Sequence, residues 1–266
     1  MQQLSPPPLT DVRLQDYDPD DTGGLSREEA SEQQNALQDR MLALQERLFA
    51  ERKKALLVVL QAMDTGGKDG TIRRVFSGVN PQGVVVSNFK APTAEELARD
   101  YLWRIHLRVP PKGYIGIFNR SHYEDVLIVR VNELVPRAVW QQRYDQINAF
   151  EKLLADTGTH ILKFYLHISK GEQKKRLQSR LDDPSKHWKF SPDDLPVRER
   201  WDDYMRAYED ALKLCNTSYA PWYIVPANRK WYRDLVVTRA IVEALEAIDP
   251  QFPEPQKDLS AIVIPD

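Results

Sequence analysis

The chain has 266 residues, enough for one or two domains. Its 37 basic and 39 acidic side chains give a formal net charge of −2, so no general field attracts nucleic acid or an anionic membrane, and any polyanion site has to be local. The polar, proline-rich N-terminus lacks the pattern of a signal peptide, and no apolar run approaches the roughly 20 residues that span a bilayer. A single cysteine, Cys215, excludes an intrachain disulfide and a multi-thiolate metal site. We therefore expect a cytoplasmic protein.

The first predicted features are an N-terminal segment and a helix. Residues 1–25 are rich in proline, aspartate and glycine, and this composition predicts a mobile arm. Ser26 and Glu29 match a capping box, which predicts that a helix begins there. Three- and four-residue spacing then predicts one apolar helix face, formed by Leu37, Met41, Leu44 and Leu48. This face would serve either self-association or packing against the rest of the fold.

Five short apolar segments, separated by stretches of helix length, predict the strands of a parallel sheet. Residues 55–60 are apolar throughout, as in strands buried on both faces. The other four segments are residues 83–88, 114–118, 161–168 and 222–225. Further capping boxes at 93–96 and 169–172 each follow a strand. Strands that alternate with helices predict a single α/β domain over residues 26–250, followed by a tail over 251–266.

A glycine-rich loop, residues 62–71, joins the first predicted strand to a helix-length segment, as in a phosphate-binding P-loop. Its glycines would let backbone N–H groups point to one centre, and Lys68 would reach bridging phosphates. Ala62 replaces the first glycine of the usual pattern, and Asp69 replaces its hydroxyl residue. The same residues would also suit an ordinary turn. However, Asp64 and Asp69 would repel phosphate unless a divalent cation lay between them, which favours a Mg²⁺-bridged substrate.

Two later segments are expected near this loop. Arg120 follows the third predicted strand, and the carboxyl ends of parallel strands meet at one edge of the sheet. Glu124 and Asp125 come next, either to hold metal-bound water and select the acceptor or as part of a surface turn. Residues 163–189 are rich in lysine and arginine, which is typical of a solvated helix face. In a P-loop protein this segment also predicts a lid, about residues 170–197, that closes over phosphates.

Five separated segments together resemble the polyphosphate kinase 2 family, and they occur in the family's order. They are residues 62–70, 88–93, 101–104, 118–123 and 186–191. The resemblance covers residues 30–250. It implies a P-loop kinase-like fold, similar to thymidylate kinase: an α/β three-layer sandwich with a five-stranded parallel sheet and a helical lid. Asn119 stands where many members have aspartate, and with Glu124 it resembles the family's class III.

The resemblance implies an enzyme that transfers the terminal phosphoryl group of inorganic polyphosphate to ADP and AMP, giving ATP. Its cofactor would be Mg²⁺, with Mn²⁺ as the alternative, and Asp64 would be the metal ligand. The nucleotide would carry adenine, with guanine as the alternative. The expected assembly is a homo-oligomer, a dimer or a tetramer. Neither nucleic acid nor a membrane is an expected partner.

The resemblance also implies roles for individual residues. The expected catalytic residues are Asp64, Lys68, Arg120, Arg176 and Arg180. The residues expected to bind polyphosphate are Gly66, Gly67, Lys68, Asp69, Gly70, Thr71, Lys174, Lys175 and Lys189. The residues expected near the nucleotide are Arg73, Arg74, Asn88, Lys90, Asn119, Arg120 and Glu124. Arg120 would bridge the donor and acceptor phosphates, while Arg176 and Arg180 would close from the lid.

Two other functions remain open from the sequence. One is an ATP-dependent nucleotide or nucleoside kinase of the same fold, which would need an adenine pocket beside the lid. The other is a non-catalytic polyanion-binding protein, which would explain the imperfect P-loop and Asn119. The remaining aromatic stripe predicts a helix face packed in the core, formed by Trp201, Tyr204, Tyr208 and Leu212.

Overall fold

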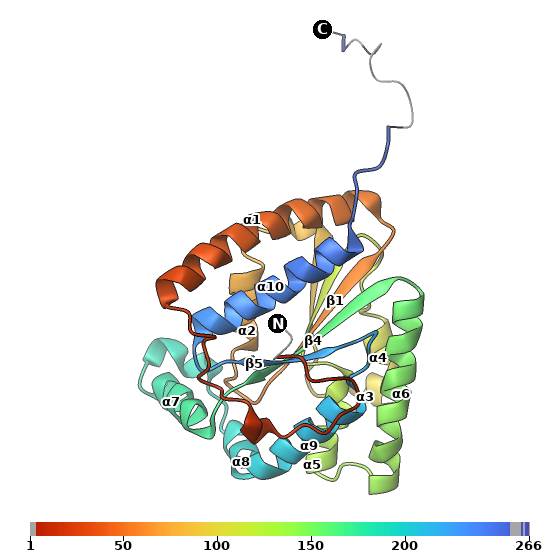
Figure 1. The fold of residues 1–266 in the computed structure, drawn as a ribbon. Helices are drawn as coiled ribbons and strands as arrows, with labels where there is room; N and C mark the ends of the chain where they lie inside the picture. The colour runs from red at the N-terminus through yellow and green to blue at the C-terminus, as the bar shows by residue number, and fades with distance from the viewer. Residues whose placement is uncertain (1–3, 256–261, 263, 266) are drawn as a thin grey trace.

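The computed structural model describes residues 4–255, 262, 264 and 265, and its centre is a parallel sheet (Figure 1). The strand order is β2-β3-β1-β4-β5. The strands are β1 Ala55–Gln61, β2 Val84–Asn88, β3 Ile115–Asn119, β4 Thr159–His167 and β5 Trp222–Pro226. Every strand lies within two residues of its predicted segment. The five-stranded parallel sheet is therefore confirmed.

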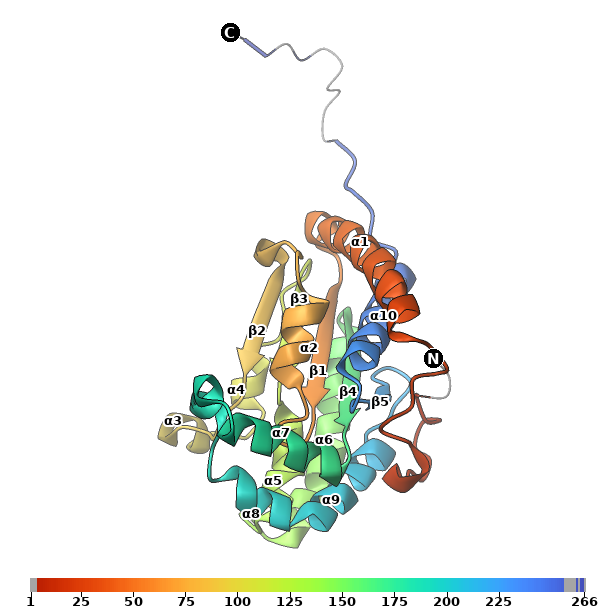
Figure 2. The same cartoon turned by 90° about the vertical axis from the view of Figure 1, so that its left-hand side faces the viewer.

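Helices pack on both faces of the sheet, as Figure 2 shows from the side. The α-helices are α1 Arg27–Glu51, α2 Lys68–Val75, α3 Ala94–Leu97, α4 Trp103–His106, α5 Ile128–Val131, α6 Arg137–Asp156, α7 Lys170–Leu181, α8 Asp194–Glu199, α9 Trp201–Leu214 and α10 Lys230–Ile248. Short 3-10 helices occur at Leu14–Asp16, Pro81–Gly83, His122–Asp125 and Pro184–Lys189. The helices α1, α2 and α10 lie together on one side, and α6 packs on β4 from the other. This is the predicted three-layer sandwich.

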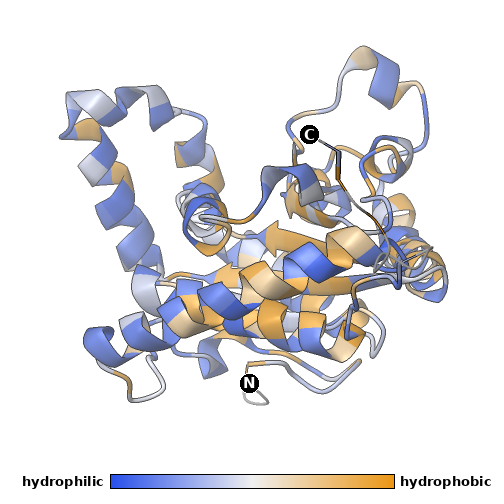
Figure 3. Ribbon diagram, turned by 90° about the horizontal axis from the view of Figure 1, so that it is seen from above, coloured by the Kyte–Doolittle hydropathy of each residue, from blue (hydrophilic) through white to orange (hydrophobic). Residues whose placement is uncertain are grey.

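The core forms where both faces of the sheet are covered. All seven residues of β1 are buried, because β3 and β4 flank the strand and helices cover it above and below. Figure 3 accordingly shows hydrophobic strands in the centre, while hydrophilic residues lie on the surrounding helices. Cys215 is buried, and so is the predicted stripe of Trp201, Tyr204, Tyr208 and Leu212. Because the first strand is held rigidly, the loop that follows it starts from a fixed point.

The predicted capping boxes show how two helices begin. Ser26 and Glu29 exchange both expected hydrogen bonds at the start of α1, and Thr93 and Glu96 do so at α3. The apolar face of α1 packs on α10, with Met41, Leu44 and Leu48 buried. Of the two uses predicted for this face, the structure shows packing within the chain.

The third capping box is only half formed. The Oγ of Ser169 accepts a hydrogen bond from the backbone N–H of Glu172 (3.0 Å), as predicted. The N–H of Ser169, however, donates to Oδ1 of Asn228 (3.0 Å), and the Glu172 carboxylate pairs with Arg176 (2.8 Å). The prediction that the Glu172 carboxylate accepts from the N–H of Ser169 is therefore wrong. The reason is that α7 packs on the segment before α10, where Asn228 accepts from this N–H, and that Glu172 pairs with Arg176.

The N-terminal segment packs against the domain instead of extending from it as a free arm. Leu4, Val12 and Leu14 are buried in the core. The carbonyl of Leu4 accepts a hydrogen bond from the N–H of Ile224 in β5 (2.7 Å). The prediction of a mobile arm is therefore wrong for residues 4–25. It rested on the many prolines and aspartates, but the three buried apolar side chains anchor the segment.

At the other end α10 finishes at Ile248, and residues 251–255 have no regular secondary structure. Half of the predicted tail, eight of its sixteen residues, lies outside the described residues. Within the described part of the chain, no helix combines the length and the hydropathy needed to cross a bilayer.

Candidate active site

A cavity of about 1160 Å³ opens at the carboxyl ends of β1, β2 and β3, and α7, α8 and the start of α10 also line it. Twelve basic side chains line this cavity, against five acidic ones. The chain as a whole carries a net charge of −2, so the positive charge is concentrated here. The cavity is therefore suited to a polyanion that is longer than a single phosphate.

The predicted P-loop lies at the floor of this cavity and depends on two glycines. A Cβ atom on Gly66 would lie 2.4 Å from the Cβ of Ala62, so the alanine that replaces the usual first glycine fits because Gly66 leaves it room. Gly67 has a φ of 104°, which favours glycine. A Cβ atom there would lie 2.0 Å from Nη1 of Arg233. The strand, loop and helix thus form the arrangement that a P-loop requires.

The loop leaves positive groups available at the start of α2. Gly67 is the N-cap residue and has no side chain to bond the first N–H groups of the helix, which can then bind an anion. Lys68 folds back over the loop, and its Nζ donates to the carbonyl of Ala62 (2.9 Å). Burial, followed by the nearby charge of Arg120, lowers the pKa of Lys68 to about 8. A bound phosphate would stabilise the charged form of this lysine.

Arg120 connects the end of β3 to the loop. Its φ of 62° is unusual for a residue other than glycine, and its N–H donates to the carbonyl of Leu60 at the end of β1 (3.1 Å). The guanidinium bonds Oδ1 of Asp64 (2.8 Å) and lies 3.7 Å from Oε2 of Glu124. Glu124 and then Asp64 raise the pKa of Arg120, so the side chain stays charged. The predicted meeting of Asp64, Arg120 and Glu124 is what the structure shows.

Asn119 joins three elements of the site. Its Nδ2 donates to Oδ1 of Asp69 (2.6 Å) at the start of α2 and to Oδ1 of Asn88 (2.8 Å) at the end of β2. An aspartate at position 119 would instead place a carboxylate against that of Asp69. The amide therefore allows these two residues to lie side by side.

Arg176 lines the cavity, but its donors hold the loop to the lid segment. Its Nε donates to Glu172 (2.8 Å). The other four N–H groups donate to the carbonyls of Thr65 (3.0 Å), Gly66 (3.2 Å), Ala227 (2.7 Å) and Asn228 (3.1 Å). With all donors engaged by the protein, Arg176 is a clamp between α7, the loop and the segment before α10. Spacing placed it correctly on α7 but could not show its partners.

The other predicted residues divide by their place in the cavity. Those that line it are Asp69, Gly70, Arg73, Arg74, Asn88, Lys90, Lys175, Arg180 and Lys189. Thr71 is buried beneath the loop, with its Oγ1 bonded to the carbonyl of Gly67 (3.1 Å). Lys174 lines a second hollow, which shares Lys175 and Ser179 with the cavity. Lys174 itself does not line the cavity, and its role in binding polyphosphate stays a prediction.

Six charged cavity residues were not predicted as site residues: Glu172, Lys186, Asp194, Lys230, Arg233 and Asp234. Arg233 is almost fully buried, and its Nε and Nη2 bond Oδ1 of Asp234 (2.8 and 2.6 Å), while Nη1 faces Gly67. Burial, and then the charges of Arg176 and Arg233, lower the pKa of Lys230. Burial and the carboxylate of Asp64 raise the pKa of Asp194 to about 6. No local motif marked Asp194 on α8 or the three residues on α10, whereas Glu172 and Lys186 lie in segments that the sequence had singled out for other reasons.

The carboxylates in the cavity fit a metal ion that arrives with phosphate. In the described residues no three His, Cys, Asp or Glu side chains gather to hold a metal by themselves. Mg²⁺, however, commonly takes only one or two carboxylates and completes its shell with phosphate oxygens and water. Asp64 is positioned for this at the loop, beside Lys68 and Arg120.

Comparisons with known proteins agree with this geometry. The family model described as Polyphosphate kinase 2 matches residues 24–253. The AMP/ADP-polyphosphate phosphotransferase of Meiothermus ruber is 56% identical over 253 residues, which are 94% of this chain and 95% of that protein. The ADP-polyphosphate phosphotransferase of Rhodopseudomonas palustris is 47% identical over 228 residues, 81% of this chain and 79% of that one.

A solved structure supports the same conclusion. Polyphosphate kinase 2 from Arthrobacter aurescens TC1 superposes with a TM-score of 0.94 at 45% sequence identity, covering 98% of this chain and 93% of that one. The likeness therefore includes the whole sheet, the P-loop and the helices around the cavity. The resemblance found in the sequence is confirmed: the chain belongs to the polyphosphate kinase 2 family.

Proposed function

We propose that this enzyme transfers the terminal phosphoryl group of inorganic polyphosphate to ADP and AMP, and that both acceptors lead to ATP. The observation that supports the proposal is the basic cavity that joins the P-loop to the lid segment. A cavity of this volume and charge suits a polyphosphate chain. Proteins named for AMP and ADP, and for ADP alone, are among the relatives, and the one named for both has the higher identity.

The donor and acceptor have separate ends of the cavity in this proposal. The donor's terminal phosphates lie on the P-loop, against Lys68 and the N–H groups of α2. The acceptor's phosphates lie beyond Arg120, near residues contributed by α2 and by the end of β2. Those acceptor residues are Arg73, Arg74, Asn88, Lys90 and Asn119. Arg120 stands between the two substrates and contacts phosphates of both.

The reaction needs little acid–base chemistry. An oxygen of the acceptor's terminal phosphate attacks the terminal phosphorus of the chain, the bridging P–O bond breaks, and the shortened chain leaves with the electron pair. The second pKa of a phosphate monoester is about 6, so the attacking group is already mostly ionised at pH 7. The main task is to bring two polyanions into line, which calls for positioning and charge neutralisation. Lys68, Arg120 and Arg180 supply that charge.

We further propose that Asp64 holds Mg²⁺, or Mn²⁺ as the alternative, between the protein and the phosphates. Such an ion supplies charge neutralisation at the transferred group. The segment from α7 to α8 acts as the lid, and Lys175, Lys186 and Lys189 follow the chain beyond the reacting phosphate. Use of guanine nucleotides, a homo-oligomeric assembly and a cytoplasmic location remain predictions from the sequence.

The test is ATP formation by the purified protein from polyphosphate and Mg²⁺, with AMP or ADP as the acceptor. EDTA and Lys68→Ala are the controls, because one removes the metal and the other the loop cation. ATP from both acceptors, abolished by either control, is the expected result. ATP from ADP alone would remove AMP as a substrate. No ATP from either would overturn the proposal and favour an ATP-dependent kinase or a binding protein.

A further inference from the structure

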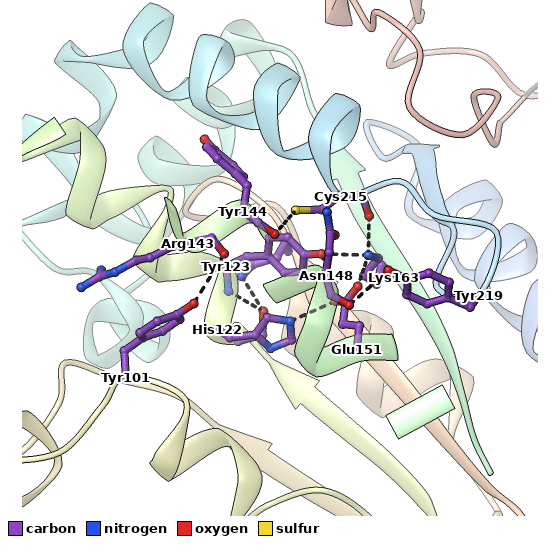
Figure 4. A network of polar contacts seen from close by, with 12 residues as sticks. Tyr101, His122, Tyr123, Arg143, Tyr144, Asn148, Glu151, Lys163, Cys215 and Tyr219 are labelled. Atoms are coloured by element: carbon purple, nitrogen blue, oxygen red, sulfur yellow. Dashed lines mark hydrogen bonds and ion pairs between the residues drawn. The ribbon is translucent and has the colours of Figure 1, made fainter. Parts of the chain in front are cut away.

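A cluster of fully buried polar side chains includes the second and third residues after Arg120 in the chain, His122 and Tyr123 (Figure 4). Glu151 comes from α6, Lys163 from β4, and His122 and Tyr123 from the 3-10 helix that follows β3. None of these four side chains lines the cavity. Any effect of this cluster on the reaction must therefore pass through another residue.

The cluster is closely hydrogen-bonded. Glu151 pairs with Nζ of Lys163 (2.6 Å) through Oε2, and its Oε1 accepts from Nε2 of His122 (3.0 Å) and from the hydroxyl of Tyr123 (2.9 Å). Lys163 also donates to Tyr123 (2.8 Å) and to the carbonyl of Cys215 (2.6 Å). Burial alone would raise the pKa of Glu151, but Lys163 and His122 outweigh it and lower the pKa. The carboxylate is thus held in its charged form.

Stability alone does not explain such a cluster. Replacing a buried ion pair by apolar side chains of similar size is often neutral or stabilising, because both charges must be removed from water to form the pair. An apolar pair, however, could not hold the ring of His122 and the hydroxyl of Tyr123 in one orientation. The charged pair of Glu151 and Lys163 therefore fixes, through hydrogen bonds, the positions of the His122 and Tyr123 side chains.

Those two residues follow the strained backbone of the site. Arg120 has a φ of 62°, a conformation that persists only where the surrounding structure enforces it. One side of the turn is held by the bond from the N–H of Arg120 to Leu60. On the other side, Ser121 Oγ accepts from the N–H of Tyr123 (3.1 Å), which ties the turn to the cluster. Loss of the cluster would free that side and let the Arg120 guanidinium move.

We infer that Glu151 and Lys163 are positioning residues that act through His122 and Tyr123 to hold Arg120 where the donor and acceptor phosphates meet. The inference rests on the proposed function, in which Arg120 bridges the two substrates. A misplacement of about 1 Å at such a point costs on the order of a hundredfold in rate. Binding of a long donor chain depends mainly on the lysines of the lid, so it should change little.

The test compares the double variant Glu151→Leu/Lys163→Met with Ile147→Ala. The double variant removes both charges at similar volume, and Ile147 is a fully buried residue of the same helix, apart from the cluster's hydrogen bonds. We expect the double variant to fold at 25 °C with a lower thermal stability, because His122, the Tyr123 hydroxyl and the Cys215 carbonyl lose partners. Its kcat should fall by about thirtyfold to a hundredfold, while KM for long polyphosphate changes less than about threefold. Ile147→Ala should lower stability and leave kcat unchanged at 25 °C. A stable double variant with wild-type kcat would overturn the inference.

A second experiment tests the inference even where the double variant Glu151→Leu/Lys163→Met folds poorly. His122→Phe keeps an aromatic ring but loses the bond to Glu151, and it is measured alone and together with Arg120→Lys. If the cluster acts through Arg120, the added loss in the Arg120→Lys background should stay below about threefold. Equal losses in both backgrounds would contradict a role through Arg120. An inactive wild type in the same assay would instead refute the proposed function.

Discussion

The two ends of the basic segment that follows β4 are built differently. At the inner end, on α7, the donors of Arg176 are all bonded within the protein, and Nε2 of Gln173 donates to the carbonyl of Asp64 (3.1 Å). At the outer end, on the helix Pro184–Lys189, the side chains are exposed, and Trp188 is 79% exposed. The inner end therefore belongs to the P-loop, while the outer end is free to meet a substrate. The sequence shows both ends only as one run of lysine and arginine, so it does not distinguish the bonded end from the exposed end.

The largest effect should come from breaking the inner end with Arg176→Ala. The change removes the bonds to four carbonyls, including those of Thr65 and Gly66, so only the bond from Gln173 to Asp64 still links the loop to α7. We expect kcat to fall by about a hundredfold, since the phosphate-binding groups lose their fixed geometry. Single-turnover kinetics with ADP measure this, and circular dichroism checks that the sheet is retained. A rate within threefold of wild type would contradict the clamp.

A smaller but still large effect is expected from Gly67→Ala. The left-handed φ of Gly67 and the closeness of Arg233 both oppose a side chain at this position. We expect a loss of about 1–3 kcal/mol in the free energy of unfolding and a weaker affinity for polyphosphate. Urea unfolding and calorimetric titration measure the two effects. Gly78→Ala is the matched control, because Gly78 also has a positive φ but has open space around it.

The inner end should also show a specific pH dependence. The pKa of Lys68 is about 8 in the free enzyme, below its ordinary value of 10.5, and bound phosphate favours the charged lysine. Binding above pH 8 therefore takes up a proton, and the affinity for polyphosphate should fall as the pH rises from 8 to 9, by up to about tenfold. Calorimetric titration at pH 9 in two buffers of different ionisation enthalpy measures the proton uptake. Uptake that persists in Lys68→Met would assign it to another group.

The smallest effect is expected at the outer end, from Lys189→Ala. This lysine lines the cavity from the helix Pro184–Lys189, beyond the part of α7 that Arg176 and Gln173 bond to the loop, so it should contact only a long donor chain. We expect KM to rise by about threefold to tenfold with long polyphosphate and not with very short chains, while kcat stays the same. Lys174→Ala is the matched control, since Lys174 lies on α7 but does not line the cavity and should have a smaller effect. Equal effects of the two substitutions would remove the distinction between cavity and surface lysines.

The sequence predicted best what depends on neighbours in the chain. Residues 55–60 were recognised as a buried strand because they are apolar throughout, and the P-loop was recognised because its glycines and Lys68 are consecutive. Arg233 was missed because it reaches the loop from α10, some 165 residues later, with no motif around it. The clamp formed by Arg176 was missed for the same reason: its acceptors are backbone carbonyls, which any sequence could supply. The cavity residues that belong to a local sequence motif were thus predicted, and those that reach the cavity only through the packing of distant helices were missed.

The N-terminal segment has a consequence for how the chain is made. Leu4 bonds Ile224, Leu14 bonds Glu209 (2.8 Å) and Asn228 bonds Pro19 (3.1 Å), so these partners are made some 200 residues after the segment itself. Contacts between residues so far apart in the chain form late in folding. The segment is therefore among the last parts to dock, and the buried Leu4, Val12 and Leu14 stay exposed to chaperones and proteases until residues 209–228 have been made.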